Sequence, residues 1–456
     1  MHINDLPRHK KIYFLGIGGI SMSSLAHILI EQGYDIVGYD RAKSELTSML
    51  EGLGAVIWYD GADCDLSDVG ACIYSAAFGA EHPQMLAVTE RGIPTYSRAE
   101  LLGAIARGFD CSIGVAGTHG KSSTTAMIYS MLCADGSSPS VLDGAVINSL
   151  GTQYHIGNSG KLVFECCEYK DSFLSFCPHI AVVLNVELDH TDYFHSIEQM
   201  RSSFAEFMSN TGNDGCAVVN LDSDEAMKAA EGYEGKLITF SLSGNRNADC
   251  YVTHCEYEHG RAIDYSVVCM GRHIDGLQLS VLGQHSVANS LAAICCGVLC
   301  GLTDEQIKCG IAAYSGIGRR FEYKGRFCGA DVYSDYAHHP DEIRVTLATA
   351  KELGANRVVT VFQPHTYSRL HDLFDGFCEA FGDSDLTVFA ETFSARETNV
   401  SGISPADLCK RVKNSIYLPT FDEIEAYLAK NLLPGDVLVI MGAGDIDNLC
   451  KIAQKE

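Results

Sequence analysis

The chain has 456 residues, of which 33 are Lys or Arg and 58 are Asp or Glu, so its formal net charge is −25. This length predicts two to four domains. A composition with 46% hydrophobic and 20% charged residues is ordinary for a globular protein and excludes a disordered chain. The acidity argues against a nucleic-acid-binding protein, which needs a basic face, although backbone N–H groups could still hold a phosphate locally.

No segment is suited to a membrane. The longest apolar run, residues 291–302, is too short to span a bilayer, and the first residues lack the layout of a signal peptide. We therefore expect a cytoplasmic protein without membrane insertion. Nineteen Cys residues without a Cys-x-x-Cys pair predict mostly buried, reduced thiols. Neither the Cys pair at 166–167 nor the group at 295–300 has zinc-site spacing, so we expect no metal cluster from them.

Strand-like apolar runs alternate with helical patterns three times, which predicts α/β units built on parallel sheets. In the first unit, a strand at residues 12–15 leads through a glycine-rich turn into a helix at 21–32. The next strand, at 34–39, ends before Asp40. Further strands are expected at residues 55–59, 71–75 and 93–96, with a domain boundary near 107–110.

The second unit opens with a strand at residues 112–116, a glycine-rich loop and a helix that reaches about Cys133. Strands at 162–165 and 180–185 fit a buried sheet, and the alternation over 249–282 predicts an antiparallel edge. A third unit starts around residues 316–321. Its strands are expected at residues 331–334, 357–362, 386–389 and 436–441.

The most informative segment is the loop Gly117-Thr-His-Gly-Lys-Ser122, which lies between a predicted strand and a predicted helix. Glycines let successive N–H groups point at a phosphate, and the helix N-terminus adds a favourable dipole. Lys121 would reach the β- and γ-phosphates of ATP, and the Ser122 hydroxyl would bind Mg²⁺. The usual pattern has Gly six residues before the Lys, where this chain has Val115, so the loop is a variant.

A second glycine-rich turn, Gly16-Ile-Gly-Gly19, follows the first predicted strand. It is similar to a dinucleotide fingerprint, but Ser21 stands where the third Gly would fall. Asp40, at the end of the next strand, could bind a ribose hydroxyl. A nicotinamide dinucleotide, a nucleotide-sugar diphosphate and a tight turn without a ligand all stay open for this segment.

Six segments in chain order resemble the Mur ligase family, and the resemblance spans residue 11 to about residue 445. Each segment alone could arise by chance, but six in register point to the family. They are Gly16-Ile-Gly-Gly-Ile-Ser-Met22, Gly117-Thr-His-Gly-Lys-Ser-Ser123, Asn185-Val-Glu-Leu-Asp-His190, Gly318-Arg-Arg-Phe-Glu322, Asp335-Tyr-Ala-His-His-Pro340 and Phe362-Gln-Pro-His-Thr-Tyr-Ser-Arg369.

The resemblance implies an α/β protein of three domains. A Rossmann-like N-terminal domain at residues 1–108 would bind a UDP-sugar, a central phosphate-loop ATPase domain at 109–316 would bind ATP, and a Rossmann-like C-terminal domain at 317–456 would bind an amino acid. It also implies a ligase of peptidoglycan precursor synthesis. ATP would phosphorylate the lactyl carboxylate of UDP-N-acetylmuramate, and the amine of L-alanine would attack the acyl phosphate and release phosphate. In such transfers the protein mainly positions groups and neutralises charge.

The resemblance further implies site residues. Lys121, Glu165 and His190 match catalytic positions, and Ser122, Glu165 and His190 match the ligands of Mg²⁺ (or Mn²⁺). The ATP site would consist of Gly117, Thr118, His119, Gly120, Lys121, Ser122, Ser123, His285, Asn289, Arg320 and Asp335. The UDP-sugar site would consist of Gly18, Gly19, Ser21, Asp40, Ser75, Arg98 and His119. The amino-acid pocket would consist of Tyr336, His338 and Arg369, whose guanidinium would clamp the alanine carboxylate.

The chain departs from the family pattern in several places. After Glu165 the family usually reads Ala-Asp-Glu-Ser-Asp, whereas this chain reads Cys166-Cys-Glu-Tyr-Lys170, which leaves the second acidic position open. Thr366 stands where many relatives have Arg, which leaves part of the amino-acid pocket open. Residues 200–203 contain no Lys, whereas several sister ligases carry a carbamylated lysine in this region. That difference agrees with the alanine-adding branch of the family.

Other functions stay open beside this one. A recycling ligase of the same family would add a preformed peptide or another amino acid. A nucleotide-binding regulator without turnover is disfavoured by the presence of Lys121, Glu165 and His190, and a nicotinamide dehydrogenase is disfavoured by Ser21 and the second phosphate loop. We expect small-molecule partners (UDP-N-acetylmuramate, L-alanine and ATP), no nucleic acid, and a monomer or a homodimer.

Overall fold

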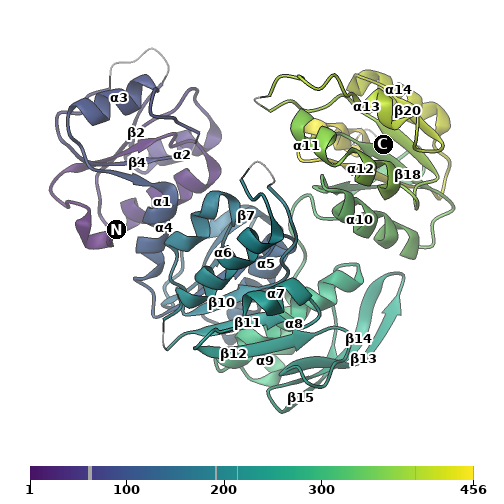
Figure 1. The fold of residues 1–456 in the computed structure, drawn as a ribbon, viewed down its shortest axis with the longest axis horizontal. Coiled ribbons are helices and arrows are strands. Elements are labelled where there is room, and N and C mark those ends of the chain that lie inside the picture. The colour runs from purple at the N-terminus through teal and green to yellow at the C-terminus, as the bar shows by residue number, and fades with distance from the viewer. Residues whose placement is uncertain (60–63, 76, 191–192, 213, 396, 455–456) are drawn as a thin grey trace. The chain divides into compact units, whose positions relative to one another are not determined.

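The structure is a computed structural model that describes residues 1–59, 64–75, 77–190, 193–212, 214–395 and 397–454. Three β-sheets with flanking helices carry the fold (Figure 1). The chain forms two compact units. The first comprises Met1–His254, Ser266–Leu277 and Ala288–Tyr314, and the second comprises Cys255–Tyr265, Gln278–Val287 and Ser315–Glu456.

The first sheet has five parallel strands in the order β3-β2-β1-β4-β5. Its central strand β1 is almost wholly buried and apolar, as expected for a parallel sheet covered on both faces. The strands are β1 (Lys11–Leu15), β2 (Ile36–Tyr39), β3 (Val56–Trp58), β4 (Val69–Tyr74) and β5 (Thr95–Ser97). The helices are η1 (Ile3–Asp5), α1 (Ile20–Glu31), α2 (Glu45–Gly52), α3 (Pro83–Glu90) and α4 (Arg98–Ala106).

The second sheet has ten strands in the order β15-β14-β13-β12-β11-β10-β6-β9-β7-β8, with β7 and β8 antiparallel. The strands are β6 (Cys111–Ala116), β7 (Ser140–Ile147), β8 (Thr152–His155), β9 (Lys161–Glu165), β10 (Ile180–Val183), β11 (Cys216–Asn220), β12 (Lys236–Ser241), β13 (Cys250–Glu258), β14 (Arg261–Cys269) and β15 (Arg272–Leu277). The helices are α5 (Lys121–Leu132), η2 (Cys133–Asp135), η3 (Tyr169–Ser175), α6 (Ile197–Ser209), α7 (Asp224–Ala229), α8 (Gln284–Leu299) and α9 (Asp304–Ala313).

Strands β13, β14 and β15 form one edge of this sheet, and two tight turns join them (Figure 1). His259 and Gly260 join β13 to β14 with φ of 47° and 74°, and Met270 and Gly271 join β14 to β15 with φ of 49° and 79°. Two successive residues with positive φ are the mark of the type I′ turn, whose twist matches antiparallel strands. The antiparallel edge predicted for residues 249–282 is therefore confirmed.

The third sheet has six strands in the order β16-β17-β21-β18-β19-β20, of which only the β16–β17 pair is antiparallel. The strands are β16 (Glu322–Phe327), β17 (Ala330–Asp335), β18 (Val358–Phe362), β19 (Leu386–Phe389), β20 (Ser415–Tyr417) and β21 (Val437–Met441). The helices are α10 (Pro340–Glu352), α11 (Tyr367–Asp372), α12 (Phe374–Ala380), α13 (Pro405–Leu408), α14 (Phe421–Asn431) and η4 (Asp445–Gln454).

The α/β class predicted from the alternating pattern is confirmed, and each strand named in advance has its counterpart in a sheet. The sequence reading did not single out β7, β8, β11, β12, β16 or β20. Among the described helices, none combines the length and the apolar character needed to cross a membrane. All nineteen cysteines are free; eight are buried, ten are half-buried and Cys309 is exposed.

Candidate active site

The loop between β6 and α5 has a backbone that only glycine adopts easily at two points. Gly117 has φ of 145° and Gly120 has φ of 84°. A Cβ atom on Gly120 would lie 2.9 Å from Oδ1 of Asn289 on α8. The predicted phosphate loop and the predicted adenine-side residue Asn289 therefore lie in direct contact, and any side chain at position 120 would separate them.

The segment after β10 holds this loop from one side. Asn185 accepts a hydrogen bond from the His119 N–H at 2.8 Å and donates one to the His119 carbonyl at 3.1 Å. Thr118 donates its hydroxyl to the Glu187 carbonyl at 3.1 Å and accepts the Glu187 N–H at 2.9 Å. The motif that begins at Asn185 thus positions the loop. Asn185 was not among the predicted site residues, although it opens one of the quoted motifs.

Lys121 lies at the first position of α5, where its side chain folds back over the loop. Nζ donates to the carbonyls of Gly117 at 2.6 Å and Thr118 at 3.1 Å. It also lies 3.0 Å from Oε2 of Glu168, a carboxylate with no exposed side-chain surface. Burial lowers the pKa of Lys121, but the charge of Glu168, the neighbouring Cys167 and Glu165, and the hydrogen bond to Glu168 together outweigh burial and raise the net pKa. The ammonium is therefore charged and fixed at the mouth of the loop.

Ser122 and Glu165 lie together one residue further along. The Ser122 hydroxyl donates to Oε2 of Glu165 at 2.6 Å, and the Gly144 N–H donates to the same oxygen at 3.1 Å. Glu165 reaches this place because it ends β9, which pairs with β6 directly before the loop. A hydroxyl and a carboxylate are the oxygen donors that Mg²⁺ prefers, so this pair fits the predicted metal position.

His190 joins the group through Glu168. Its Nε2 lies 3.9 Å from Oε1 of Glu168 and 3.9 Å from Oδ2 of Asp189, and its ring lies 4.7 Å from that of Tyr169. Glu168 thus contacts both Lys121 and His190. Sequence reasoning left this carboxylate unassigned. Its position depends on the turn in η3, where Lys170 and Asp171 have φ of 53° and 54°.

Six of the seven predicted UDP-sugar residues lie near the carboxyl edge of the first sheet, and the seventh, His119, lies in the loop after β6. Asp40 accepts the Gly18 N–H at 2.7 Å, and a Cβ on Gly18 would lie 2.9 Å from the same carboxylate. Arg98, the first residue of α4, donates to the Ser21 hydroxyl at 2.9 Å. Burial lowers the pKa of Arg98, which nevertheless stays charged. Gly19 caps α1, and Ser75 follows β4.

In the second unit, Asp335 ends β17 and is buried. Its carboxylate accepts the N–H groups of Phe321 at 2.7 Å and Ala337 at 2.8 Å, together with the Thr346 hydroxyl at 3.1 Å. Burial raises the pKa of Asp335, in opposition to the nearby charge of Arg320 and these hydrogen bonds. Asp335 therefore organises the residues around the turn after β17 in addition to any contact with a ligand.

The predicted amino-acid residues form one cluster in the same unit. The Tyr336 ring lies 5.4 Å from the His338 ring. The guanidinium groups of Arg319 and Arg320 lie over the Tyr336 ring, at 4.8 and 5.5 Å from its centre. Arg369 Nη1 lies 3.3 Å from Nδ1 of His365, whose ring is 6.0 Å from that of His338. Burial lowers the pKa of His338, and burial with the charges of His338 and Arg369 lowers that of His365 to about 4. His365 was missed, although it lies inside the motif that ends at Arg369.

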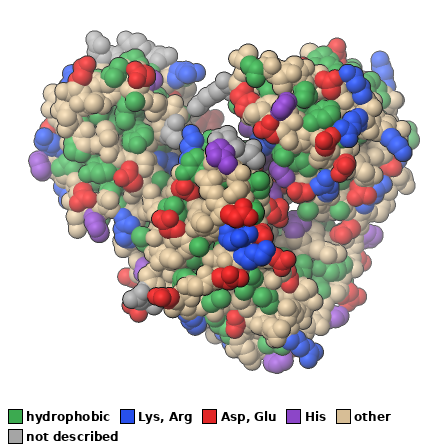
Figure 2. Space-filling model, in the orientation of Figure 1, with side chains coloured by type: hydrophobic (Ala, Val, Ile, Leu, Met, Phe, Trp, Pro, Cys, Tyr) green, Lys and Arg blue, Asp and Glu red, His purple; other side chains and the backbone are tan. Residues whose placement is uncertain are grey.

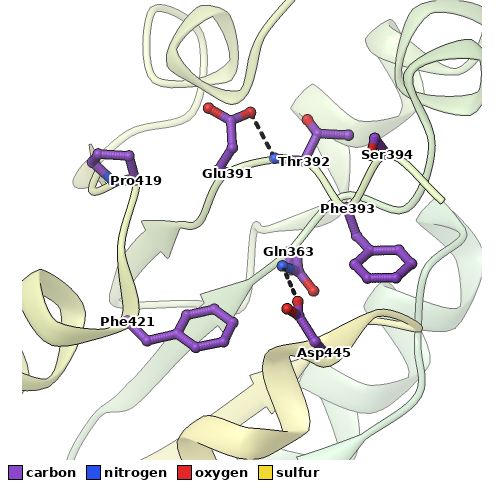
Figure 3. Close-up of a pocket in the computed structure, with 8 residues that line it drawn as sticks. All are labelled: Gln363, Glu391, Thr392, Phe393, Ser394, Pro419, Phe421 and Asp445. Carbon is purple, nitrogen blue, oxygen red and sulfur yellow. Dashed lines mark hydrogen bonds between the residues drawn. The ribbon is translucent and has the colours of Figure 1, made fainter. Parts of the chain in front are cut away.

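A pocket of about 320 Å³ borders this cluster (Figure 3). It opens after the carboxyl ends of β18 and β19, where ligands of open α/β sheets bind. Gln363 donates to Asp445 at 2.9 Å, between the rings of Phe393 and Phe421, and the Phe393 ring stacks on His365 at 5.7 Å. No residue lining it had been predicted. The lining residues are Gln363, Glu391, Thr392, Phe393, Ser394, Pro419, Phe421 and Asp445.

The predicted ATP residues are divided between the two units. Residues 117–123 and Asn289 belong to the first unit, whereas His285, Arg320 and Asp335 belong to the second. Within the first unit the structure brings together the loop, Asn289, Glu165 and His190. Within the second, Arg320 lies 3.4 Å from Glu342 and beside Tyr336, and His285 is exposed in the first turn of α8.

Three family models match the chain in succession. They are described as "Mur ligase family, catalytic domain" for residues 11–110, "Mur ligase middle domain" for 115–297 and "Mur ligase, glutamate ligase domain" for 319–444. Two similar curated proteins are UDP-N-acetylmuramate–L-alanine ligases. That of Lachnospira eligens is 41% identical and that of Agathobacter rectalis 39%, each over 98% of this chain and 98% of its own.

Solved structures agree with these relatives. The UDP-N-acetylmuramate-alanine ligase MurC of Thermotoga maritima superposes with a TM-score of 0.80 at 26% identity, over 98% of this chain and 99% of its own. The murein peptide ligase of Psychrobacter arcticus shares the fold, with a TM-score of 0.72 at 20% identity over 98% of both chains. With full-length relatives at this identity and three consecutive domain matches, the chain belongs to the Mur ligase family.

Proposed function

We propose that this chain is an ATP-dependent ligase that joins L-alanine to the lactyl carboxylate of UDP-N-acetylmuramate in cytoplasmic peptidoglycan precursor synthesis. The observation that carries the proposal is the arrangement at the phosphate loop. A charged Lys121 is held by loop carbonyls and Glu168, and the Ser122–Glu165 pair lies one residue further. A cation beside paired oxygen donors is what phosphoryl transfer from ATP requires.

In the first step, an oxygen of the lactyl carboxylate attacks the γ-phosphorus of ATP and ADP leaves. Lys121 would neutralise charge that develops on the transferred group, because two loop carbonyls hold its ammonium beside the loop. Mg²⁺ (or Mn²⁺) held by Ser122, Glu165 and His190 would supply further positive charge to the phosphates. Asn289, in contact with Gly120, would meet the adenine side of the nucleotide.

In the second step, the amine of L-alanine attacks the acyl carbon, the amine gives up a proton and phosphate leaves. Arg369 would bind the alanine carboxylate, with Tyr336 and His338 beside it. Because its lowered pKa keeps His338 neutral near pH 7, its ring adds no second positive charge to this pocket. Excluding water at this stage would protect the acyl phosphate from hydrolysis.

The first sheet would bind the UDP end of the sugar nucleotide through Gly18, Gly19, Ser21, Asp40, Ser75 and Arg98, with His119 at the sugar.

We also propose the division into domains at residues 1–108, 109–316 and 317–456, because each would carry one sheet and one substrate. Acidic and basic side chains alternate in small groups over the face shown in Figure 2, which suits small-molecule substrates better than nucleic acid.

The experiment is phosphate release from ATP by the full-length protein with UDP-N-acetylmuramate and one acceptor at a time. L-Alanine should support turnover, with other amino acids and a murein tripeptide much weaker. If the tripeptide supports turnover and L-alanine does not, the protein is a peptide-recycling ligase instead. Binding of ATP without phosphate release under any condition would refute the ligase reaction.

A further inference from the structure

Three cysteines that take no part in the proposed reaction lie together inside the first unit. The sulfur atoms of Cys250, Cys269 and Cys295 all lie within 4.8 Å of one another, and none of the three residues has exposed surface. Among the residues that the structure describes, no other set of three His, Cys, Asp or Glu side chains meets this distance. The group therefore differs from the scattered thiols elsewhere in the chain.

The fold fixes all three positions. Met270 donates its N–H to the Asp249 carbonyl at 2.6 Å, and the Thr253 hydroxyl donates to the Ser266 carbonyl at 3.1 Å, so β13 and β14 pair in a register that sets Cys250 opposite Cys269. The two-residue turn at His259 and Gly260, which joins β13 to β14, holds that register. Cys295 reaches the pair from α8, which packs its apolar residues inward.

We propose that Cys250, Cys269 and Cys295 form a binding site for one thiophilic divalent cation, such as Zn²⁺. A zinc–sulfur bond is about 2.3 Å, so two thiolates on one tetrahedral ion lie about 3.8 Å apart. Sulfurs already within 4.8 Å need to shift by less than about 1 Å to share an ion. On binding, each thiol releases its proton to the solvent, because the thiolate is the ligand.

Charge favours a divalent over a monovalent ion. Three thiolates carry three negative charges, so a divalent ion leaves a net charge of −1 and a monovalent ion leaves −2. Burying the smaller net charge costs less free energy, so the divalent ion is favoured. The carboxylate of Asp249, the residue before Cys250, is already engaged, because its Oδ2 accepts the Thr239 N–H at 2.8 Å and the Thr239 hydroxyl at 3.0 Å. Three sulfurs supply three ligands of a tetrahedral ion, and one water molecule enclosed with the ion would complete the coordination.

The proposal concerns a structural site, independent of the proposed ligase reaction. Cys295 lies six residues after Asn289 on α8, about 9 Å along the helix axis. An ion at the three sulfurs would join α8 to the β13–β14 pair, so it should stabilise the first unit whether or not any substrate is bound.

Metal binding to the full-length protein tests this. The protein is reduced, stripped with chelator and supplied with Zn²⁺ or Cd²⁺ in excess Mg²⁺, which occupies oxygen-rich sites. One tightly held equivalent per chain is expected, with thiolate-to-cadmium charge-transfer absorption and a higher melting temperature. Cys269→Ser and Cys295→Ser should lose all three signals. Cys296→Ser, a buried neighbour on the same helix, should keep them.

Two outcomes would overturn the site. One is that the wild-type protein retains no more metal than Cys269→Ser. The other is that Cys296→Ser loses as much bound metal as Cys269→Ser does. If Cys269→Ser does not fold, Cys269→Ala replaces it. Either variant is used only if its metal-free form unfolds cooperatively in a thermal melt. None of these readouts needs ATP or UDP-N-acetylmuramate, so failure of the ligase assay leaves this test intact.

Discussion

The two glycine-rich loops of this chain, residues 16–19 and 117–120, have the same strand–turn–helix setting and different chemistry. In the first, the Gly18 N–H is bound by the Asp40 carboxylate, and α1 opens with Ile20 where the other helix opens with a lysine. In the second, Lys121 opens α5 and its ammonium is fixed by loop carbonyls and Glu168. The comparison separates a loop organised by an anionic side chain from a loop organised by a cationic one.

This difference teaches that glycine spacing alone does not tell a binding loop from a reaction loop. The Asp40 carboxylate can accept hydrogen bonds from hydroxyl groups, and its negative charge would repel a phosphate in direct contact with it. A buried ammonium suits a group whose negative charge grows during transfer. The first loop should therefore affect substrate affinity, and the second should affect the rate of the chemical step.

The largest expected effect is in the second loop. Lys121→Met should lower kcat for phosphate release by at least about 10²–10³-fold, because a fixed charge on the transferred group is lost. It also leaves Glu168 buried without its cation, which destabilises a protein by about 3–5 kcal/mol. The double variant Lys121→Met/Glu168→Gln separates the two effects. It should regain thermal stability without regaining activity, and recovery of activity would contradict the role of Lys121.

The next effect concerns the Ser122–Glu165 pair beside the same loop. Glu165→Ala should raise the Mg²⁺ concentration for half-maximal activity by tenfold or more, on the order of a lost metal ligand. Activity at saturating Mg²⁺ or Mn²⁺ should partly return. Glu165→Gln keeps an oxygen acceptor for the Ser122 hydroxyl and should lie between the two. An Mg²⁺ titration of Glu165→Ala that matches wild type would remove this residue from the metal site.

A smaller effect is expected in the first loop. Asp40→Ala removes the acceptor of the Gly18 N–H and should raise KM for UDP-N-acetylmuramate about tenfold, the value of one charged hydrogen bond. The kcat and the KM for ATP should change little. Asp40→Asn can still accept from Gly18 and serves as the matched control for loop geometry. A fall in kcat with unchanged KM would place the first loop in the chemical step and break the comparison.

The smallest effect is on stability against pH. The folded pKa of His365 is about 4, below its ordinary value of 6.5, so protonation favours the unfolded chain. This contribution is complete above about pH 6.5 and is lost as the pH falls toward 4. His365→Phe keeps a ring against Phe393 and should show a smaller drop in melting temperature between pH 7 and 4. The exposed His371→Phe should behave as wild type; an equal drop in all three proteins would exclude His365 as a source.

Local patterns foretold the elements around the site. The strand before Gly117 and the helix after it follow from an apolar run, glycines and a helical stretch, and the structure has β6 and α5 at these places. The contact between Ser122 and Glu165 follows once β9 is placed beside β6. By contrast, the roles of Glu168 and His365 depend on long-range neighbours, and no local periodicity marks them.

Pairing register was equally out of reach. Cys250 and Cys269 are 19 positions apart, and the two-residue turn at His259 and Gly260 decides whether they lie opposite each other. Motif spacing for zinc sites describes short intervals, so it argued against a metal at residues 295–300 and could not indicate Cys250 and Cys269 as distant partners of Cys295. The strand β20, which the sequence did not indicate, has three residues, too few to show a period.

The two turns at 259–260 and 270–271 also set an order of events during folding. A two-residue hairpin forms within about 1–10 μs, whereas docking of a distant helix must await closure of a longer loop. Cys250 and Cys269 should therefore meet while α8 is still detached and solvent can reach both sulfurs. A nascent chain in an oxidising medium would be exposed to cross-linking at that moment. Refolding yield should accordingly depend on reductant during folding far more than on reductant added to the finished protein.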